Sequence, residues 1–341
     1  MRKTISVDEI IRDIYVSPSK PAIRLARKYG YLPYMVERYI RIIGLRETTK
    51  LLEAFEKPLA PVIRTNTVLI EPEKLTKKLE SLGFNLEPIA WLPYAFRVVR
   101  APRSPSIGST HEYLKGLYYV HRDAAALLPP VLLIDDRYEG DALDMCAAPG
   151  GKATHLAQLL YGRGRVIAND LVLYRIKSLI GHVMRMRLDN VDVTWADARK
   201  LPSIMKRRFK RILLDAPCSG EGTIMFDPGR KTRTTINDLA VIVKREIELL
   251  NAALDMLEPG GILAYSTCSI APEENEYVIY RLMMIRDDFE IVEPRNKLFE
   301  WSTWLTSYKD MDYPDDYMKC VRIWPHRHGM IGFTVCLLRK T

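Results

Sequence analysis

The spacing of hydrophobic positions divides the chain into three parts. In residues 1–58, apolar side chains recur every three or four positions, for example at Ile10 and Ile14, which is the period of an amphipathic helix. Two prolines close together, Pro58 and Pro61, then interrupt this pattern as a linker would. We therefore predict an N-terminal helical region over residues 1–58.

The second part combines strand and helix patterns. Residues 62–70 read V-I-R-T-N-T-V-L-I, an alternating strand, and residues 72–82 form an amphipathic helix that ends at Gly83. Residues 89–99 supply further strand material with aromatic side chains. This order predicts a small α+β module over residues 59–112. Its aromatic side chains could stack bases, although core packing is their commoner role.

In the third part, residues 113–341, short apolar runs alternate with helical segments. The predicted strands are 141–146, 166–168, 191–195, 211–214, 262–265, 289–292 and 332–338. The predicted helices are 152–160, 171–188, 236–257 and 272–286. This alternation predicts an α/β fold with a doubly wound, seven-stranded sheet.

A glycine turn, Gly150-Gly151, connects the first of these strands with its helix. Such a turn lets backbone N–H groups approach a ligand closely. A phosphate-binding Walker loop would need Gly in place of Cys146 and Ser or Thr in place of Ala153, and the dinucleotide motif G-x-G-x-x-G is also absent from this turn. We therefore expect an adenosine ligand that has no pyrophosphate.

Three carboxylates, Asp170, Asp197 and Asp215, follow three strands of the predicted sheet. The carboxyl ends of parallel strands are where such sheets bind ligands. We expect Asp170 to accept both ribose hydroxyls and Asp197 to lie near the adenine amino group. One such Asp is usually a turn or cap residue. Three after a glycine turn favour S-adenosyl-L-methionine (SAM), whose sulfonium, ammonium and ribose suit acidic surroundings.

Two thiols, Cys218 and Cys268, follow the ends of two strands that are expected to be neighbours, so both should face one pocket. A carboxylate and a thiol three residues apart, Asp215 and Cys218, suit pyrimidine chemistry, because a thiol can add to the ring while a carboxyl bonds its edge. A capping Asp and a structural Cys are the simpler interpretation. Either thiol could be the nucleophile, and the helix predicted from Pro272 would help Cys268 to ionise.

Charge and composition limit the kinds of molecule that this protein is expected to bind. The net charge is +9 and the isoelectric point is about 9.2, which favours RNA or DNA. Five cysteines without Cys-x-x-Cys spacing argue against a disulfide framework or a zinc site, so we expect a cytoplasmic protein in which Cys320 and Cys336 pack as small apolar groups. No apolar segment is long enough for a membrane span. His326 and His328 form too weak a pair to predict a metal.

Basic side chains gather in two places that could contact RNA. The run from Lys206 to Arg211 is one. The other is a basic face on the N-terminal helices, formed by Arg24, Arg27, Lys28, Arg38, Arg41 and Arg46. Solvated surface is the usual role of such residues.

Three segments resemble the signatures of the Nol/Nop/Sun (Fmu/Sun) family of RNA cytosine-C5 methyltransferases, of an archaeal type that modifies tRNA or rRNA. They are D-M-C-A-A-P-G-G-K, L-L-D-A-P-C-S-G-E-G-T and Y-S-T-C-S-I-A-P-E-E-N-E. The likeness continues in P-V-I-R-T-N-T and R-I-W-P-H-R-H-G-M-I-G-F and covers about residues 35–341. It implies a Rossmann-like SAM-dependent methyltransferase domain over residues 113–341, preceded by an RRM-like RNA-binding module over residues 59–112.

The resemblance also implies residue roles. Cys268 attacks C6 of the cytosine, Cys218 helps to release the product, Asp215 bonds the base edge around N3 and N4, and Lys152 lies close to cofactor and base. The implied cofactor-binding residues are Cys146, Ala147, Ala148, Pro149, Gly150, Gly151, Lys152, Asp170, Arg175, Asp197 and Asp215. The chain departs from the family pattern at His121–Ala126, where Gln followed by small hydroxyl residues is usual, and at His182, where Asn is common.

The expected function is therefore SAM-dependent RNA (cytosine-C5) methylation by a monomer, on tRNA in preference to rRNA because the N-terminal module is small. Three alternatives stay open: an rRNA substrate, a DNA cytosine-C5 methyltransferase in which Cys218 is the nucleophile, and a non-catalytic RNA-binding assembly factor.

Overall fold

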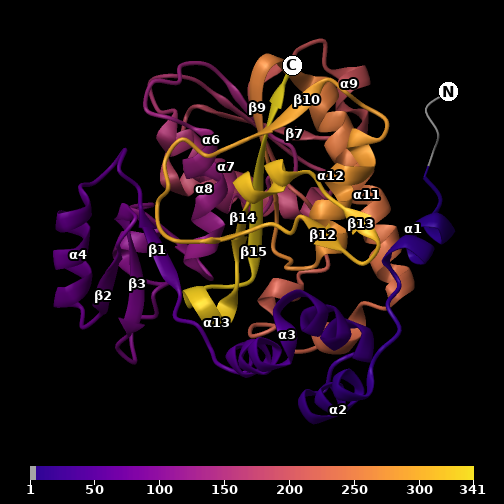
Figure 1. Cartoon of the computed structure of the whole chain (residues 1–341). Coiled ribbons are helices and arrows are strands. Elements are labelled where there is room, and N and C mark those ends of the chain that lie inside the picture. Colours follow the sequence, from indigo (N-terminus) through magenta and orange to yellow (C-terminus); the bar gives the residue numbers. More distant parts are fainter. Residues whose placement is uncertain (1–4) are drawn as a thin grey trace.

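The computed structural model describes residues 5–341, so residues 1–4 of the region expected to be helical lie outside the described residues. Three helices occupy the rest of that region (Figure 1): α1 (Val7–Ile14), α2 (Lys20–Tyr29) and α3 (Pro33–Phe55). Ser6 and Ser19 cap the first two, each accepting a backbone N–H from three residues ahead. Inside α3, Gly44 has a φ of 76° and kinks the helix.

A four-stranded sheet follows, in the order β2-β3-β1-β4. Its elements are β1 (Val62–Thr65), α4 (Pro72–Ser81), β2 (Asn85–Ile89), β3 (Leu92–Arg100) and β4 (Tyr118–His121). The strand predicted over residues 62–70 was too long, because the chain turns at Asn66. The buried Asn66 amide donates to Gly116 O (3.0 Å) and Met186 O (2.9 Å), and its oxygen accepts the N–H of Val68 (3.3 Å). β4 pairs with β1 although it follows residue 112.

The large sheet has the order β11-β14-β15-β9-β8-β5-β6-β7, and β10 also pairs with β15. Its strands are β5 (Ala142–Asp144), β6 (Val166–Asp170), β7 (Val191–Trp195), β8 (Phe209–Asp215), β9 (Leu257–Thr267), β10 (Phe289–Val292), β11 (Ser302–Thr303), β14 (Val321–Ile323) and β15 (Phe333–Lys340). The five strands from β7 to β9 are parallel, and β15 is antiparallel to β9. The predicted doubly wound α/β fold is confirmed, and the short strands β11 and β14 widen the expected seven-stranded sheet.

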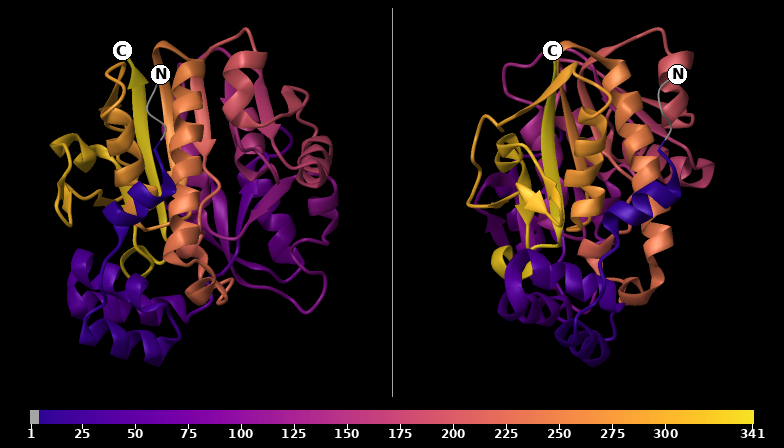
Figure 2. Two further views of the ribbon diagram at one scale, coloured as in Figure 1. Left: turned by 90° about the vertical axis from the view of Figure 1, so that its right-hand side faces the viewer. Right: turned by 45° about the vertical axis from the view of Figure 1, so that its right-hand side comes forward.

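Helices cover both faces of this sheet (Figure 2). One face packs on α1, α9 (Leu201–Ile204), α11 (Ile236–Met256) and α12 (Glu276–Met283), and the other on α6 (Leu128–Leu133), α7 (Gly151–Leu159) and α8 (Leu173–Met186). Shorter elements are α5 (His111–Leu114), α10 (Arg230–Arg233), α13 (Pro325–His328) and the hairpin β12–β13 (Ser307–Tyr308, Met311–Asp312). Within residues 5–341, no helix has both the length and the apolar character that a bilayer crossing requires.

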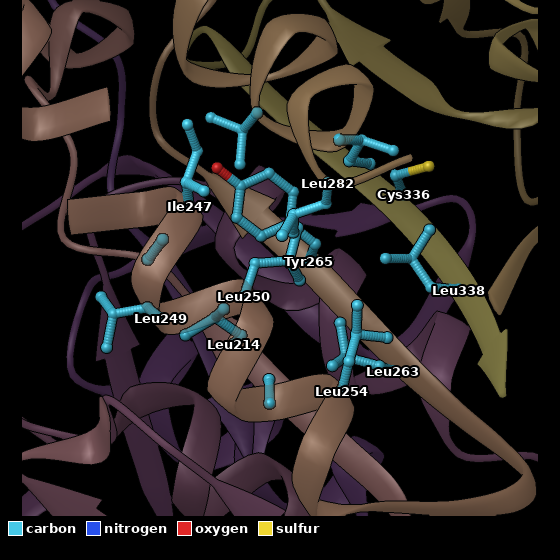
Figure 3. Close-up of a cluster of buried hydrophobic side chains, with 14 of the residues drawn as sticks. Leu214, Ile247, Leu249, Leu250, Leu254, Leu263, Tyr265, Leu282, Cys336 and Leu338 are labelled. Carbon is cyan, nitrogen blue, oxygen red and sulfur yellow. The ribbon is translucent and has the colours of Figure 1, made fainter. Parts of the chain in front are cut away.

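The core between α11 and the sheet is shown in Figure 3. Leu214 of β8 and Leu263 of β9 meet Leu250 and Leu254 of α11, and all four side chains are fully buried. The apolar positions of α11 recur every three or four residues, which gives the helix one continuous apolar face. Helix α11 thus covers β8 and β9, which pair with each other in the middle of the large sheet.

Two sequence-based expectations fail in the C-terminal part. Cys320 and Cys336 are buried as expected, but they form a disulfide with an S–S distance of 2.02 Å. Cys320 immediately precedes β14, which pairs with β15, and this pairing brings the two residues together. The helix predicted over residues 272–286 is a 3-10 turn (Pro272–Glu274) followed by the shorter helix α12, and Glu273, Glu274 and Glu276 are all buried.

Candidate active site

The carboxyl ends of the parallel strands surround a cavity of about 360 Å³. It is lined by Met145, Cys146, Ala148, Asp170, Leu171, Val172, Arg175, Asp197, Ala198, Arg199, Asp215, Ala216, Pro217, Cys218, Gly220, Arg230, Arg245, Leu249 and Cys268. The three predicted carboxylates and both predicted thiols therefore share one cavity. Its place at the strand ends is where open α/β sheets bind ligands.

The glycine turn is held by the end of β6. Ala147 N–H donates to Asn169 O (2.7 Å), Ala148 N–H donates to the Asp170 carboxylate (3.1 Å), and Arg175 contacts Ala148 O. Gly150 has a φ of 113°, a conformation that favours glycine. Because the amides of Ala147 and Ala148 are already bonded within the protein, they are not free to bind a phosphate.

Among the predicted cofactor residues, six line the cavity and five do not. Those that line it are Cys146, Ala148, Asp170, Arg175, Asp197 and Asp215. Ala147, Pro149, Gly150, Gly151 and Lys152 form the rest of the turn and the start of α7. Asp170 is nearly buried with Arg175 at 3.7 Å, and Asp197 pairs with Arg199 at 2.7 Å. A carboxylate-lined cavity beside a turn whose Ala147 and Ala148 amides are already bonded fits SAM better than a phosphate-bearing nucleotide.

The two thiols meet directly, as expected from their strand ends. Cys218 Sγ and Cys268 Sγ lie 3.1 Å apart. Backbone bonds fix the two loops: Ala216 N–H donates to Ser266 O (2.8 Å), and Gly222 N–H donates to Cys268 O (2.9 Å). The prediction that both sulfur atoms face one pocket is therefore confirmed.

The environment makes the two thiols unlike each other. The hydrogen bond from Cys218 lowers the pKa of Cys268, opposing the effect of burial, and the cations of Lys152 and Arg230 act in the same direction. The same bond, together with burial, raises the pKa of Cys218. Although the nearby Asp215 charge acts against it, the net effect lowers the pKa of Cys268, which favours Cys268 as the thiolate and Cys218 as the S–H donor. The expected helix effect is not the first cause, because α12 begins only at Glu276.

Asp215 ends β8 within reach of two partners. Lys152 Nζ donates to Asp215 Oδ2 at 2.7 Å, and Ser266 Oγ donates to Asp215 Oδ1 at 2.8 Å. Burial alone would lower the pKa of Lys152, but the charge and hydrogen bond of Asp215 raise it above its ordinary value. Lys152 therefore stays an ammonium, and the motif residues that the resemblance placed near the base lie together.

Sequence reasoning missed several groups at this site. Asp144, fully buried at the end of β5, has a pKa raised to about 8 by burial and by Asp215. Arg230 lines the cavity, although no motif marks it. Arg38 was expected on a solvated basic face, but it is fully buried and pairs with Glu221 and with Glu273 (3.2 Å), one in each cysteine loop.

The two departures from the family pattern lie behind the glycine turn. His121 is buried, and a Cβ at Gly151 would lie 3.3 Å from its ring. The His182 ring packs on Tyr119 with their centroids 4.8 Å apart. Both histidines therefore support the turn from outside the cavity.

The basic run and the histidine pair that the sequence singled out lie outside the cavity. The run from Lys206 to Arg211 stands at the start of β8, the end of the sheet opposite Asp215, where Arg207 pairs with Asp141. His326 lies 3.3 Å from Glu47, and His328 accepts the N–H of Trp324 (2.9 Å). Within residues 5–341, no group of three His, Cys, Asp or Glu side chains is arranged to hold a metal ion.

Comparison with known proteins gives consistent matches. Residues 131–339 match the family described as 16S rRNA methyltransferase RsmB/F, and residues 32–121 match the N-terminal domain of 16S rRNA methyltransferase RsmF. The human 28S rRNA (cytosine(4447)-C(5))-methyltransferase is 34% identical over 320 residues, which are 93% of this chain and 38% of that protein. Ribosomal RNA small subunit methyltransferase F of Shewanella woodyi is 33% identical over 292 residues, which are 83% of this chain and 58% of that protein.

Solved structures share the whole fold. A methyltransferase homologue from Pyrococcus horikoshii is 33% identical with a TM-score of 0.83, and the match covers 95% of this chain and all of that one. NSun6 from the same organism, solved with SFG, has a TM-score of 0.76 at 24% identity, covering 89% of this chain and 97% of that one, which supports the fold alone. The chain spans 38% and 58% of the length of the human and Shewanella woodyi relatives.

Proposed function

The chain belongs to the 16S rRNA methyltransferase RsmB/F family, the Nol/Nop/Sun group that its motifs predicted, and from this premise we propose that it transfers a methyl group from SAM to C5 of cytosine in RNA. One observation carries the proposal: the 3.1 Å contact between Cys218 and Cys268 in a cavity that also holds Asp170, Asp197 and Asp215. A scaffold that only binds RNA would have no need of a thiol pair with opposite pKa shifts.

Cys268 is the nucleophile in this proposal. Its lowered pKa favours the thiolate, the form that attacks carbon. The sulfur electron pair forms a bond to C6 of the cytosine, and the C5–C6 electrons move toward C5, which becomes nucleophilic. Bound SAM supplies the electrophilic methyl group that C5 takes up. A water molecule then accepts the C5 proton, the C5–H electron pair restores the C5–C6 double bond, and the S–C6 bond breaks with its electron pair returning to Cys268.

Cys218 and Asp215 assist two other steps of this reaction, release of the product and binding of the base. The Cys218 S–H group contacts the attacking sulfur and is placed to assist its departure from C6. Asp215 lies at the cavity wall, where its carboxyl group can bond the N3 and N4 edge of an unstacked cytosine. Lys152, bonded to Asp215 at 2.7 Å, holds that carboxyl group in place. Asp170 and Asp197 would hold the ribose and adenine of SAM.

We place rRNA first among the RNA substrates. The relatives named above are rRNA methyltransferases, and the sequence-based preference for tRNA has no support from them. The net charge of +9 agrees with any polyanionic substrate and does not choose between the two. Both tRNA and rRNA should therefore be tested as substrates.

The test is methyl transfer from labelled SAM to separate tRNA, rRNA and DNA fractions, followed by digestion to nucleosides. The proposal expects 5-methylcytidine in RNA, predominantly in rRNA, and none with Cys268→Ser. Label only in tRNA would replace the rRNA assignment, and 5-methyldeoxycytidine would contradict the RNA assignment. SAM binding without incorporation into any nucleic acid would favour the non-catalytic scaffold.

A further inference from the structure

Each thiol of the pair is followed in sequence by a serine, and both serines bond the same carboxylate. Glu274 accepts the backbone N–H of Ser219 (2.6 Å) and the Ser219 hydroxyl (2.6 Å). It also accepts the hydroxyl of Ser269. One side chain therefore joins the residues that directly follow Cys218 and Cys268.

Glu274 is fully buried, and its position is fixed from the side of β9. The Tyr265 hydroxyl of β9 donates to Glu274 O at 2.6 Å. Burying a carboxylate is costly unless hydrogen bonds compensate, and here three donors reach it. Two of these three donors belong to Ser219, which lies in the loop that carries Cys218.

We propose that Glu274 is a positioning residue that holds the Cys218 loop against the Cys268 loop and so sets the contact between their sulfur atoms. The catalytic consequence rests on the proposed function, but the geometric claim does not. A displacement of about 1 Å at reacting atoms can reduce a rate by about 100-fold. Loss of this carboxylate should therefore affect the thiol pair before it affects cofactor binding.

A purely structural role would make a different prediction. If Glu274 only stabilised the fold, its loss would lower the folded fraction without changing the thiols of the molecules that stay folded. The discriminating variants are Glu274→Gln, which keeps the length and one acceptor oxygen, Glu274→Ala, and Ser269→Ala, which removes a single hydroxyl. Glu276→Gln is a matched control, because Glu276 is equally buried in the same segment but bonds Arg322 and the N–H of Leu305 instead of the cysteine loops.

The first measurement needs neither RNA nor SAM. Diamide, which takes two electrons and two protons from a pair of thiols, is added to the folded protein, and the Cys218–Cys268 disulfide is followed by peptide mass spectrometry. Two sulfur atoms 3.1 Å apart should oxidise quickly in the wild type and in Glu276→Gln. We expect Glu274→Ala to slow this step by about 10- to 100-fold, with Ser269→Ala and Glu274→Gln between the two.

The second measurement is methyl transfer with the same proteins. We expect Glu274→Ala to lower kcat by about 100-fold while the Kd for SAM stays at the wild-type value. Unchanged oxidation rates in folded Glu274→Ala, Glu274→Gln and Ser269→Ala would overturn the inference. If these rates respond but the wild type transfers no methyl group, the positioning role stands and the proposed function falls.

Discussion

The sulfur atoms of Cys218 and Cys268 lie 3.1 Å apart although 50 positions separate the two residues in sequence. The contact follows from the sheet: β8 and β9 are adjacent and parallel, with Asp215 opposite Ser266. Each thiol stands two or three residues past this pair, so both loops leave the sheet at the same level. The predictions below depend on this relationship.

The two thiols should differ in the pH at which they are alkylated. The pKa of Cys268 is lowered, first through the Cys218 hydrogen bond, and the pKa of Cys218 is raised. Only the thiolate reacts, so iodoacetamide should modify Cys268 at lower pH than Cys218, as read by peptide mass spectrometry. In Cys218→Ala the S–H donor is gone, and the Cys268 profile should move to higher pH. Equal profiles for the two thiols in the wild type would refute the assigned asymmetry.

Lys152→Met removes the partner of Asp215 and a cation that lowers the pKa of Cys268. Hydrogen bonds to charged groups contribute about 1.5–3 kcal/mol, so kcat/KM should fall by roughly 10- to 100-fold. The rising limb of the pH–rate profile should also move to higher pH, because Cys268 ionises less readily. Lys77→Met on the exposed side of α4 is the matched control and should leave the profile unchanged.

Asp144 should make stability depend on pH. Its pKa rises from an ordinary 3.8 to about 8 in the folded protein, first through burial and then through Asp215, so the folded state retains a proton that the unfolded state releases. The stability that this proton contributes is complete below pH ~4 and is lost as the pH rises through 8. Between pH 5 and 8 the wild type should therefore lose unfolding free energy relative to Asp144→Asn, at most about 1.4 kcal/mol per pH unit.

Denaturant unfolding of both proteins at pH 5 and pH 8 measures this difference. Groups that the two proteins share cancel in the comparison, including Glu273, whose pKa is also raised, to about 7, by burial. A difference between the two proteins that stays constant with pH would show that Asp144 does not titrate in this range.

The central strands were predictable because buried parallel strands are continuous apolar runs, as in Ile212–Leu214. The three strand-end carboxylates and the shared thiol pocket followed from the same sheet rule. The strand over residues 62–70 was overestimated, because its end depends on Asn66 bonding Gly116 and Met186, which are distant in sequence. Such partners leave no local pattern.

The groups that support the cysteine loops were missed for the same reason. Arg38 reads as one more basic residue on a helix, and its partners Glu221 and Glu273 are 183 and 235 positions away. The burial of Glu273, Glu274 and Glu276 likewise depends on long-range contacts that leave no local pattern. The disulfide between Cys320 and Cys336 depends on β14, a strand of three residues that gives almost no periodic signal.

The assignment of Cys268 as the nucleophile is tested most directly by trapping the covalent complex with SAM and RNA that carries 5-fluorocytidine, in which C5 has no proton to lose after it is methylated. We predict a stable protein–RNA adduct with the wild type and with Cys218→Ser, and none with Cys268→Ser, as read by denaturing gel and by the mass of the linked peptide. An adduct that persists in Cys268→Ser and disappears in Cys218→Ser would contradict the account.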